Sequence, residues 1–360
     1  MNNLKLALAC VLIILFQFRV VKCQSSQNDL LITFDKFCKI FDQNYASFEE
    51  KQIDWDKMCE ESRIKISSSM SDEDFFDLLS DMLRPLNDGH VTLRAKDLDK
   101  GFSANRPSRI IKELESIPGK ERRPKFKKMT WETLKSYGFK EIKEIGPEFR
   151  GEKLFHFTDN GKTGYLRMLR SFSKRGKMVG VKLQSQLDQI FNSFQGLEGI
   201  VIDVRFNMGG EDKFSQNIVG RIIDEEIIGF YKQTRADGEF GPLKKRMVKP
   251  KGKKTFRNKV VLITNDRTVS AADVLALMMS QLPNVTIIGE PSNGSYSDLY
   301  DLTLPNGWKL TLSNQRYLSV DMKNYEGLGT PVDIECLNTL EDVISLNDSV
   351  LKVGLDLLNE

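Results

Sequence analysis

The sequence contains few of the residues from which metal and redox centres are built. Among its 360 residues are five cysteines and two histidines, with no Cys-x-x-Cys pair and no histidine cluster. A zinc centre or a redox-active dithiol is therefore not expected. Neither a Gly-x-Gly-x-x-Gly motif nor the P-loop lysine pattern is present, which argues against a phosphate cradle. We accordingly expect a protein that works without a metal or a cofactor.

Long hydrophobic runs are also missing, except at the N-terminus. Lys5 precedes an apolar run from Leu6 to Phe18, and a polar stretch begins after Cys23. This pattern predicts a secretory signal peptide over residues 1–23, cleaved near Cys23. The alternatives are an uncleaved membrane anchor or a wrongly assigned start, but the run is shorter than the about 20 residues that span a bilayer. We therefore expect a secreted protein, or one of a secretory or periplasmic compartment, without stable membrane insertion after cleavage.

The predicted mature chain has no excess of charge of either sign. Residues 1–23 contain three basic residues and no acid, so their removal leaves 50 basic and 50 acidic residues. Two basic tracts remain, over residues 120–128 and 244–259. Such tracts occur in proteins that bind nucleic acids, but a neutral chain on the secretory route favours solvated loops. No nucleic-acid partner is expected.

Cysteine usage fits an oxidising compartment. Cys38 and Cys59 lie in neighbouring predicted helices, so a disulfide between them is possible there. Cys336 would be left unpaired.

The pattern along the chain predicts an α/β protein with two structured parts. Residues 24–93 form a predicted helical domain, and Ser71 followed by Asp74 is typical of a helix-capping box. Residues 94–160 are charged and weakly periodic, and we expect them to connect the two parts. Residues 161–345 alternate apolar strands with helices, which is typical of βαβ units around a largely parallel sheet. Residues 346–360 are predicted as a C-terminal tail.

Ser270 stands between a predicted strand, residues 259–264, and a helix that begins near Ala271. A serine at this place is most often only the helix cap, because its hydroxyl group can accept a free backbone N–H. The same place lies at the carboxyl end of a strand, where open α/β sheets hold their ligands. The N–H groups at the start of a helix also suit a developing oxyanion. Ser270 is therefore a candidate nucleophile as well as a candidate cap.

Two neighbouring glycines follow the apolar strand at 199–205. Gly209 and Gly210 can adopt backbone conformations that are closed to other residues, so their N–H groups can turn toward a substrate oxygen. A plain turn from a strand to a helix is the commoner use of such a pair.

Two histidines are the only candidates for an imidazole base. His90 follows an Asp-Gly turn, whereas His156 lies between two phenylalanines in a predicted strand. The turn favours His90, although a single histidine is more often structural. Glu326, in a loop that contains glycine and proline, could orient the imidazole as the acid of a Ser-His-acid relay.

Six sequence blocks, in order from residue 88 to residue 334, carry a family resemblance. Together they resemble the C-terminal processing, or tail-specific, serine peptidases, a family that also includes the tricorn core protease and the interphotoreceptor retinoid-binding proteins. The resemblance implies a catalytic domain of ClpP/crotonase-like fold, preceded by a small helical domain, with Ser270 as the nucleophile. The blocks are DGHVTL (88–93), GYLRMLRSF (164–172), GIVIDVRFNMGG (199–210), VVLITNDRTVSAAD (260–273), IIGEPSNG (287–294) and LPNG through YEGLGTPVDI (304–334).

The branches of this family differ in the base that they use. The bacterial tail-specific enzymes use a lysine, but the corresponding position here is Ser295, which disfavours a Ser-Lys dyad. The tricorn-like branch uses a histidine and a glutamate that correspond to His90 and Glu326. Its oxyanion donors correspond to Gly209 or Gly210, and to Ala271. Gly89 stands where tricorn-like enzymes can carry a serine, and residues 94–160 show no clear PDZ module.

The resemblance therefore implies a secreted serine-type endopeptidase that hydrolyses a peptide or protein substrate. A non-catalytic carrier of apolar ligands on the same fold is the alternative, since the retinoid-binding relatives act in this way. The intact Ser-His-Glu set and the glycine pair favour the hydrolase. Acyl-thioester chemistry, a third interpretation of the fold, conflicts with the predicted signal peptide.

Overall fold

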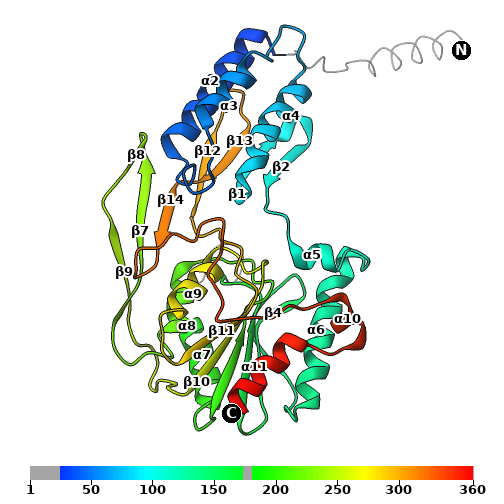
Figure 1. Ribbon diagram of the computed structural model, residues 1–360, viewed down its shortest axis with the longest axis vertical. Helices are drawn as coiled ribbons and strands as arrows, with labels where there is room; N and C mark the ends of the chain where they lie inside the picture. The colour runs from blue at the N-terminus through cyan, green and yellow to red at the C-terminus, as the bar shows by residue number, and fades with distance from the viewer. Residues whose placement is uncertain (1–24, 173–180, 360) are drawn as a thin grey trace, which may run out of the picture.

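The computed structural model describes residues 25–172 and 181–359. The predicted signal peptide, residues 1–23, lies outside the described residues. Within those residues, no helix combines the length and apolar character needed to cross a membrane. A helical lobe, at the top of Figure 1, sits on a larger α/β part.

A seven-stranded sheet forms the centre of the larger part, in the order β15-β11-β10-β6-β5-β4-β3. The strands from β15 to β5 run parallel, and β4 and β3 are added antiparallel. The predicted largely parallel sheet is confirmed, and it also includes residues 143–159 of the predicted connection. The strands are β3 (Lys143–Phe149), β4 (Glu152–Asp159), β5 (Thr163–Met168), β6 (Gly199–Asp203), β10 (Lys259–Thr264), β11 (Val285–Gly289) and β15 (Ile334–Glu335).

Helices cover both faces of this sheet, because successive residues of a strand point to opposite faces. Ile200 and Ile202 of β6 belong to the hydrophobic core formed with α7, α8 and α9, whereas Val201 belongs to the core formed with α6 and α11. Strands that are buried on both faces need continuous apolar sequence, as in GIVID. The helices are α6 (Gly119–Ser136), α7 (Val181–Ser193), α8 (Asp212–Val219), α9 (Ala271–Met279) and α11 (Ser349–Asn359).

The helical lobe is built from two distant parts of the chain. Its helices share one hydrophobic core with a four-stranded sheet of order β12-β13-β1-β2, and Trp308 belongs to that core. The capping box of Ser71 and Asp74 is present, and Cys38 and Cys59 form a disulfide. The elements are α2 (Gln27–Asn44), α3 (Trp55–Arg63), α4 (Asp72–Leu83), β1 (Asp88–Ala95), β2 (Lys100–Ala104), β12 (Leu299–Thr303) and β13 (Lys309–Ser313).

A third sheet contains the long strand β7, and two short helices complete the chain. The paired strands are β14 (Gln315–Leu318), β7 (Ile227–Ala236), β8 (Glu239–Phe240) and β9 (Lys244–Val248), and the helices are α5 (Arg109–Glu113) and α10 (Leu340–Ser345).

The expectation that both basic tracts are solvated loops is wrong for residues 120–128 and 244–248. Residues 120–128 lie within α6, and residues 244–248 form β9. Lysine and arginine are good helix formers. Phe126 and Met129, spaced for one helix face, are buried in a common core. A charged composition therefore concealed a helix with one apolar side.

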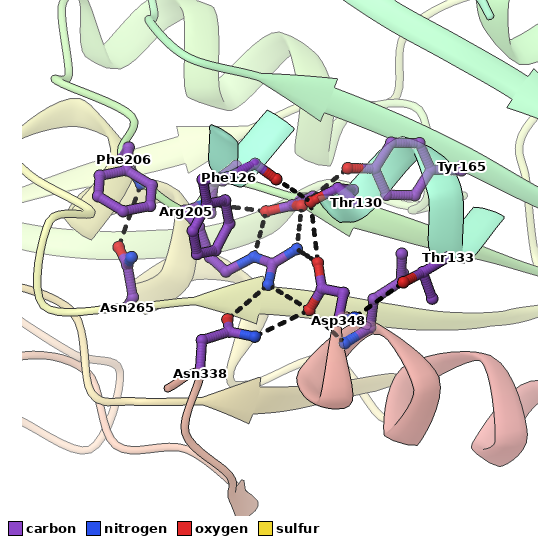
Figure 2. A network of polar contacts seen from close by, with 12 residues as sticks. Phe126, Thr130, Thr133, Tyr165, Arg205, Phe206, Asn265, Asn338 and Asp348 are labelled. Atoms are coloured by element: carbon purple, nitrogen blue, oxygen red, sulfur yellow. Dashed lines mark hydrogen bonds and ion pairs between the residues drawn. The ribbon is translucent and has the colours of Figure 1, made fainter. Parts of the chain in front are cut away.

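A buried ion-pair network anchors α11 to the sheet (Figure 2). Arg205, just after β6, donates to Asp203 at 2.6 Å and to Asp348 at 2.8 Å, and the three side chains are at most 1% exposed. Thr130 of α6 and Tyr165 of β5 donate to the same carboxylates. Burial alone would raise the pKa of both aspartates, but Arg205 outweighs it and their pKa values are lowered. Residues 346–360, predicted as a tail, thus include a helix fixed by buried charge.

Candidate active site

Ser270 has a strained backbone at the start of α9. Its φ is 61° and its ψ is −124°, and such sparsely populated conformations cost about 1–3 kcal/mol. Ser26 and Ser71, which cap α2 and α4, have extended backbones with φ values of −70° and −78°. A serine that serves only as a cap therefore does not need the conformation of Ser270. The strain favours a functional position for the Ser270 hydroxyl group.

Asp273 and Gly209 hold Ser270 in this conformation. The carboxylate of Asp273 accepts the N–H of Ser270 at 2.6 Å and that of Gly294 at 2.8 Å. Burial raises the pKa of Asp273 to about 6, although hydrogen bonds to its ionised form oppose this rise. Gly209 packs against the serine so closely that a Cβ atom there would lie 2.5 Å from the Cβ of Ser270. Only glycine fits at this point.

His90 lies in β1, where burial favours the neutral form of its imidazole. Its backbone N–H donates to Oδ1 of Asp88 at 2.9 Å. Burial lowers the pKa of His90, and the charges of Asp88 and Asp298 oppose this effect. The Nδ1 atom is buried and has no hydrogen-bond partner in the described part of the chain. A neutral imidazole is the form that a general base requires.

Glu326 is buried in the loop between β14 and β15. Its Oε2 accepts the N–H of Tyr296 at 3.0 Å, whereas Oε1 has no hydrogen-bond partner among the described residues. Burial, and after it the charge of Asp88, raises the pKa of Glu326 well above its usual value. Tyr45, at the end of α2, donates its hydroxyl to Asp88 at 3.1 Å. This hydrogen bond joins α2 to β1 within the helical lobe.

A cavity of about 490 Å³ brings Ser270 and His90 together, although 180 positions separate them in the sequence. Glu326 does not line this cavity. Over residues 25–172 and 181–359, no hydrogen bond joins Ser270 to His90 or His90 to Glu326, and no group of His, Cys, Asp or Glu side chains could hold a metal ion. Of the three predicted catalytic residues, Ser270 and His90 thus line one cavity. Glu326 is buried near Asp88.

The predicted oxyanion donors differ in their availability. The N–H of Gly209 is occupied, because it donates to Oδ1 of Asn207 at 2.9 Å. Gly210 lines the cavity. In the part of the chain that the structure describes, the N–H groups of Gly210 and Ala271 have no hydrogen-bond partner. Of the two glycines, Gly210 is therefore the available donor.

His156 lies apart from this cavity, in β4. Its ring packs edge-on against Trp131, with ring centroids 5.6 Å apart. Burial, followed by the positive charges of Lys127 and Arg167, lowers the pKa of His156 to about 3. The choice of His90 over His156 as the base stays a prediction.

Sequence reasoning missed four residues of the site: Asp88, Tyr45, Asp273 and Asp298. Asp88 stands two positions before His90 and Asp273 three positions after Ser270, so both had a local signal in their spacing. Asp298 lines the cavity, but neither it nor Tyr45 lies in a motif that the sequence marks.

Two family models match the chain. The model of peptidase family S41 matches residues 162–336, and the model of the tricorn protease C1 domain matches residues 32–84. By these matches, the chain is similar to the serine peptidases of family S41. The S41 serine peptidases are hydrolases, and the chain is assigned to this class of enzyme. No sequence among the curated proteins matches this chain.

Solved structures show that this chain shares its fold with structures of peptidases. A putative peptidase from Parabacteroides merdae ATCC 43184 is 24% identical, with a TM-score of 0.74, and the match covers 93% of this chain and 98% of the other. Mature CPAF, solved in complex with lactacystin, is 12% identical with a TM-score of 0.67, covering 92% and 99%. The tricorn protease is 16% identical with a TM-score of 0.53, covering 92% of this chain and 37% of the other. The α/β architecture is consistent with the predicted ClpP/crotonase-like fold.

Proposed function

We propose that this protein is a secreted endopeptidase in which Ser270 is the nucleophile, His90 the base and Glu326 the acid that orients His90. The observation that carries the proposal is the strained backbone of Ser270 at a cavity that His90 also lines. Strain of this kind is retained where a function depends on it.

In the proposed mechanism, Oγ of Ser270 attacks the carbonyl carbon of a peptide bond while His90 takes up its proton. The N–H groups of Gly210 and Ala271 stabilise the oxyanion of the tetrahedral intermediate. His90 then gives the proton to the leaving amine, and the C–N bond breaks. Water, activated by the same imidazole, hydrolyses the acyl-enzyme and regenerates Ser270.

The acids near His90 have two proposed roles. Asp88 fixes the backbone of His90 through its N–H. Oε1 of Glu326 and Nδ1 of His90 are both buried without a hydrogen-bond partner in the described residues. We expect Oε1 of Glu326 to accept the N–H at Nδ1 of His90 when a peptide fills the cavity, which would stabilise the imidazolium.

Labelling with a fluorophosphonate probe tests the nucleophile. Peptide mass spectrometry of the folded protein should place the adduct on Ser270 alone. The adduct should be absent from Ser270→Ala and strongly reduced in His90→Ala, while both variants keep the circular dichroism spectrum of the wild type. A folded protein without an adduct would contradict the proposal and favour the carrier of apolar ligands.

The secretory location rests on the predicted signal peptide and is supported by the disulfide between Cys38 and Cys59, since disulfides persist in oxidising compartments. N-terminal sequencing of the mature protein should give a first residue close to position 24. A protein that retains residues 1–23 would contradict cleavage.

A further inference from the structure

A second cavity, of about 630 Å³, adjoins the cavity of Ser270 and His90. Arg123 and Met208 line both. We call it the basic cavity, because six basic side chains line it: Lys120, Arg123, Lys127, Lys128, Arg150 and Arg170. Only two acids, Glu132 and Glu152, are among its lining residues. The basic tract of α6 thus borders a cavity that adjoins the cavity of Ser270 and His90.

Most of these basic side chains are not neutralised by the protein. Lys127 approaches Glu144 and Glu152 at 3.4 and 3.7 Å, and Arg170 donates to backbone carbonyl oxygens. The remaining four form no ion pair or hydrogen bond through their side chains within the described residues: Lys120, Arg123, Lys128 and Arg150. The positive charges of these four side chains are therefore available to bind an anionic ligand.

The positive charges around the basic cavity lower the pKa values of two groups, Arg123 and His156, although burial is the larger cause in both. Arg123 is partly open to solvent, yet desolvation and the repulsion of Arg267 and Arg150 lower its pKa, against the attraction of Glu152. Behind the cavity wall formed by Trp131, Arg167 is 2% exposed, and its Nε and Nη1 have no hydrogen-bond partner in the described chain. The pKa of His156 is lowered to about 3, in part by these charges. Bound negative charge would relieve the repulsion.

We propose that the basic cavity binds an acidic segment of the peptide substrate, to one side of the bond that Ser270 cleaves. This rests on the proposed function. Arg106, Arg123 and Arg267 line the catalytic cavity itself, where Asp298 is the only acid among the lining residues. Positive charge thus extends from Ser270 into the basic cavity. Such complementarity raises both the rate of encounter and the specificity for acidic partners.

A binding experiment that does not depend on hydrolysis tests the basic cavity. Two fluorescent peptides are compared that differ only in having aspartate and glutamate, or asparagine and glutamine, in one flank. Their binding to Ser270→Ala is followed by fluorescence anisotropy at low ionic strength. We expect the acidic peptide to bind about tenfold tighter, a ratio that corresponds to ~1.4 kcal/mol. The ratio should fall as salt is added.

Matched charge variants in the Ser270→Ala background locate the effect. Lys120→Gln/Lys128→Gln should reduce the ratio of the affinities for the acidic and the neutral peptide toward 1. Adding Arg123→Gln should reduce this ratio further. Lys253→Gln/Lys254→Gln removes the same charge from exposed positions outside both cavities and should leave the preference unchanged. The same ratio is then measured as kcat/KM in enzymes that carry Ser270.

Three outcomes would overturn the proposal: equal binding of the two peptides, a preference that survives in Lys120→Gln/Lys128→Gln, or tighter binding of a short oligonucleotide with no preference between the peptides. Failure of the proposed function looks different. In that case the acidic peptide binds selectively, but the enzyme with Ser270 does not hydrolyse it.

Discussion

Two buried polar clusters in this protein differ in how completely they are satisfied. In the cluster of Arg205, Asp203 and Asp348, every carboxylate oxygen accepts a hydrogen bond. In the cluster of His90, Asp88 and Glu326, Nδ1 of His90 and Oε1 of Glu326 are buried without partners among the described residues. A satisfied network fixes one conformation, whereas unmet polar groups cost stability. The first cluster therefore stabilises the fold, whereas the second leaves polar groups free of intramolecular partners, as the proposed function requires.

The carboxyl groups of the two clusters show the same difference. Arg205 outweighs burial and lowers the pKa of Asp203 and Asp348. Glu326 is buried beside another acid, and its pKa is raised. One cluster stabilises ionised carboxylates, and the other opposes ionisation. Carboxyl groups with a pKa raised by burial and by a neighbouring acid are typical of functional sites.

The largest expected effect is a difference in kcat/KM between variants of the two histidines. His90→Ala should lower kcat/KM by about 1,000-fold or more, because the base is lost. His156→Ala removes the other buried imidazole, which lies outside the cavity, and should lower stability while kcat/KM stays within a few-fold. Steady-state kinetics and thermal unfolding of both variants measure this. A similar loss of activity in His156→Ala would contradict the placement of the site.

The second largest expected effect is a loss of stability when the cluster of Arg205, Asp203 and Asp348 is broken. Asp348→Ala leaves Arg205 buried with one partner fewer and should lower the free energy of unfolding by about 3–5 kcal/mol. Asp356→Ala, on the exposed side of the same helix, loses only the exposed hydrogen bond from Tyr137 and should lower it by no more than about 1 kcal/mol. Urea unfolding gives both values. Unchanged stability in Asp348→Ala would show that this cluster does not fix α11.

Glu326→Gln should lower activity but not stability. Loss of the orienting acid is expected to reduce kcat/KM by about 100-fold. Because the pKa of Glu326 is raised in the folded state, its contribution to wild-type stability declines as the pH rises from about 4.5 toward that raised value. The glutamine variant lacks this decline. Above neutral pH it should therefore be at least as stable as the wild type, and a lower stability there would contradict the raised pKa.

The smallest effect concerns strain at Ser270. Ser270→Gly removes a side chain at positive φ and should raise the free energy of unfolding by up to about 1 kcal/mol while abolishing activity. Ser71→Gly, at an ordinary cap, should lower it by a few tenths of a kcal/mol. Chemical denaturation compares the two, and equal effects would argue against strain at Ser270.

Much of the sheet could be predicted from the sequence, because a strand that is buried on both faces needs an unbroken apolar run. GIVID and KVVLIT have such runs, and they became β6 and β10. Residues 120–128 were misinterpreted, since their charges outnumber the apolar positions that α6 buries. The contribution of Trp308 to the helical lobe could not be predicted either, because it depends on pairing between β1 and β13.

The candidate site was predictable where its chemistry lies in local motifs. Ser270, His90, the glycine pair and Glu326 each stand in a recognisable block. Asp88 and Asp273 were within reach of the same reasoning. Tyr45 was not, because its hydrogen bond to Asp88 joins a helix to a strand 43 positions away.

The sequence by itself determined the elements and the kinds of reactive group, since periodicity and residue chemistry are local properties. Only the tertiary structure decided which groups share a cavity, because Ser270 and His90 meet through the packing of two parts of the chain. It also decided that Gly210 rather than Gly209 has an available N–H. Burial, which shifts the pKa values of His90 and Glu326 in opposite directions, exists only in the folded protein.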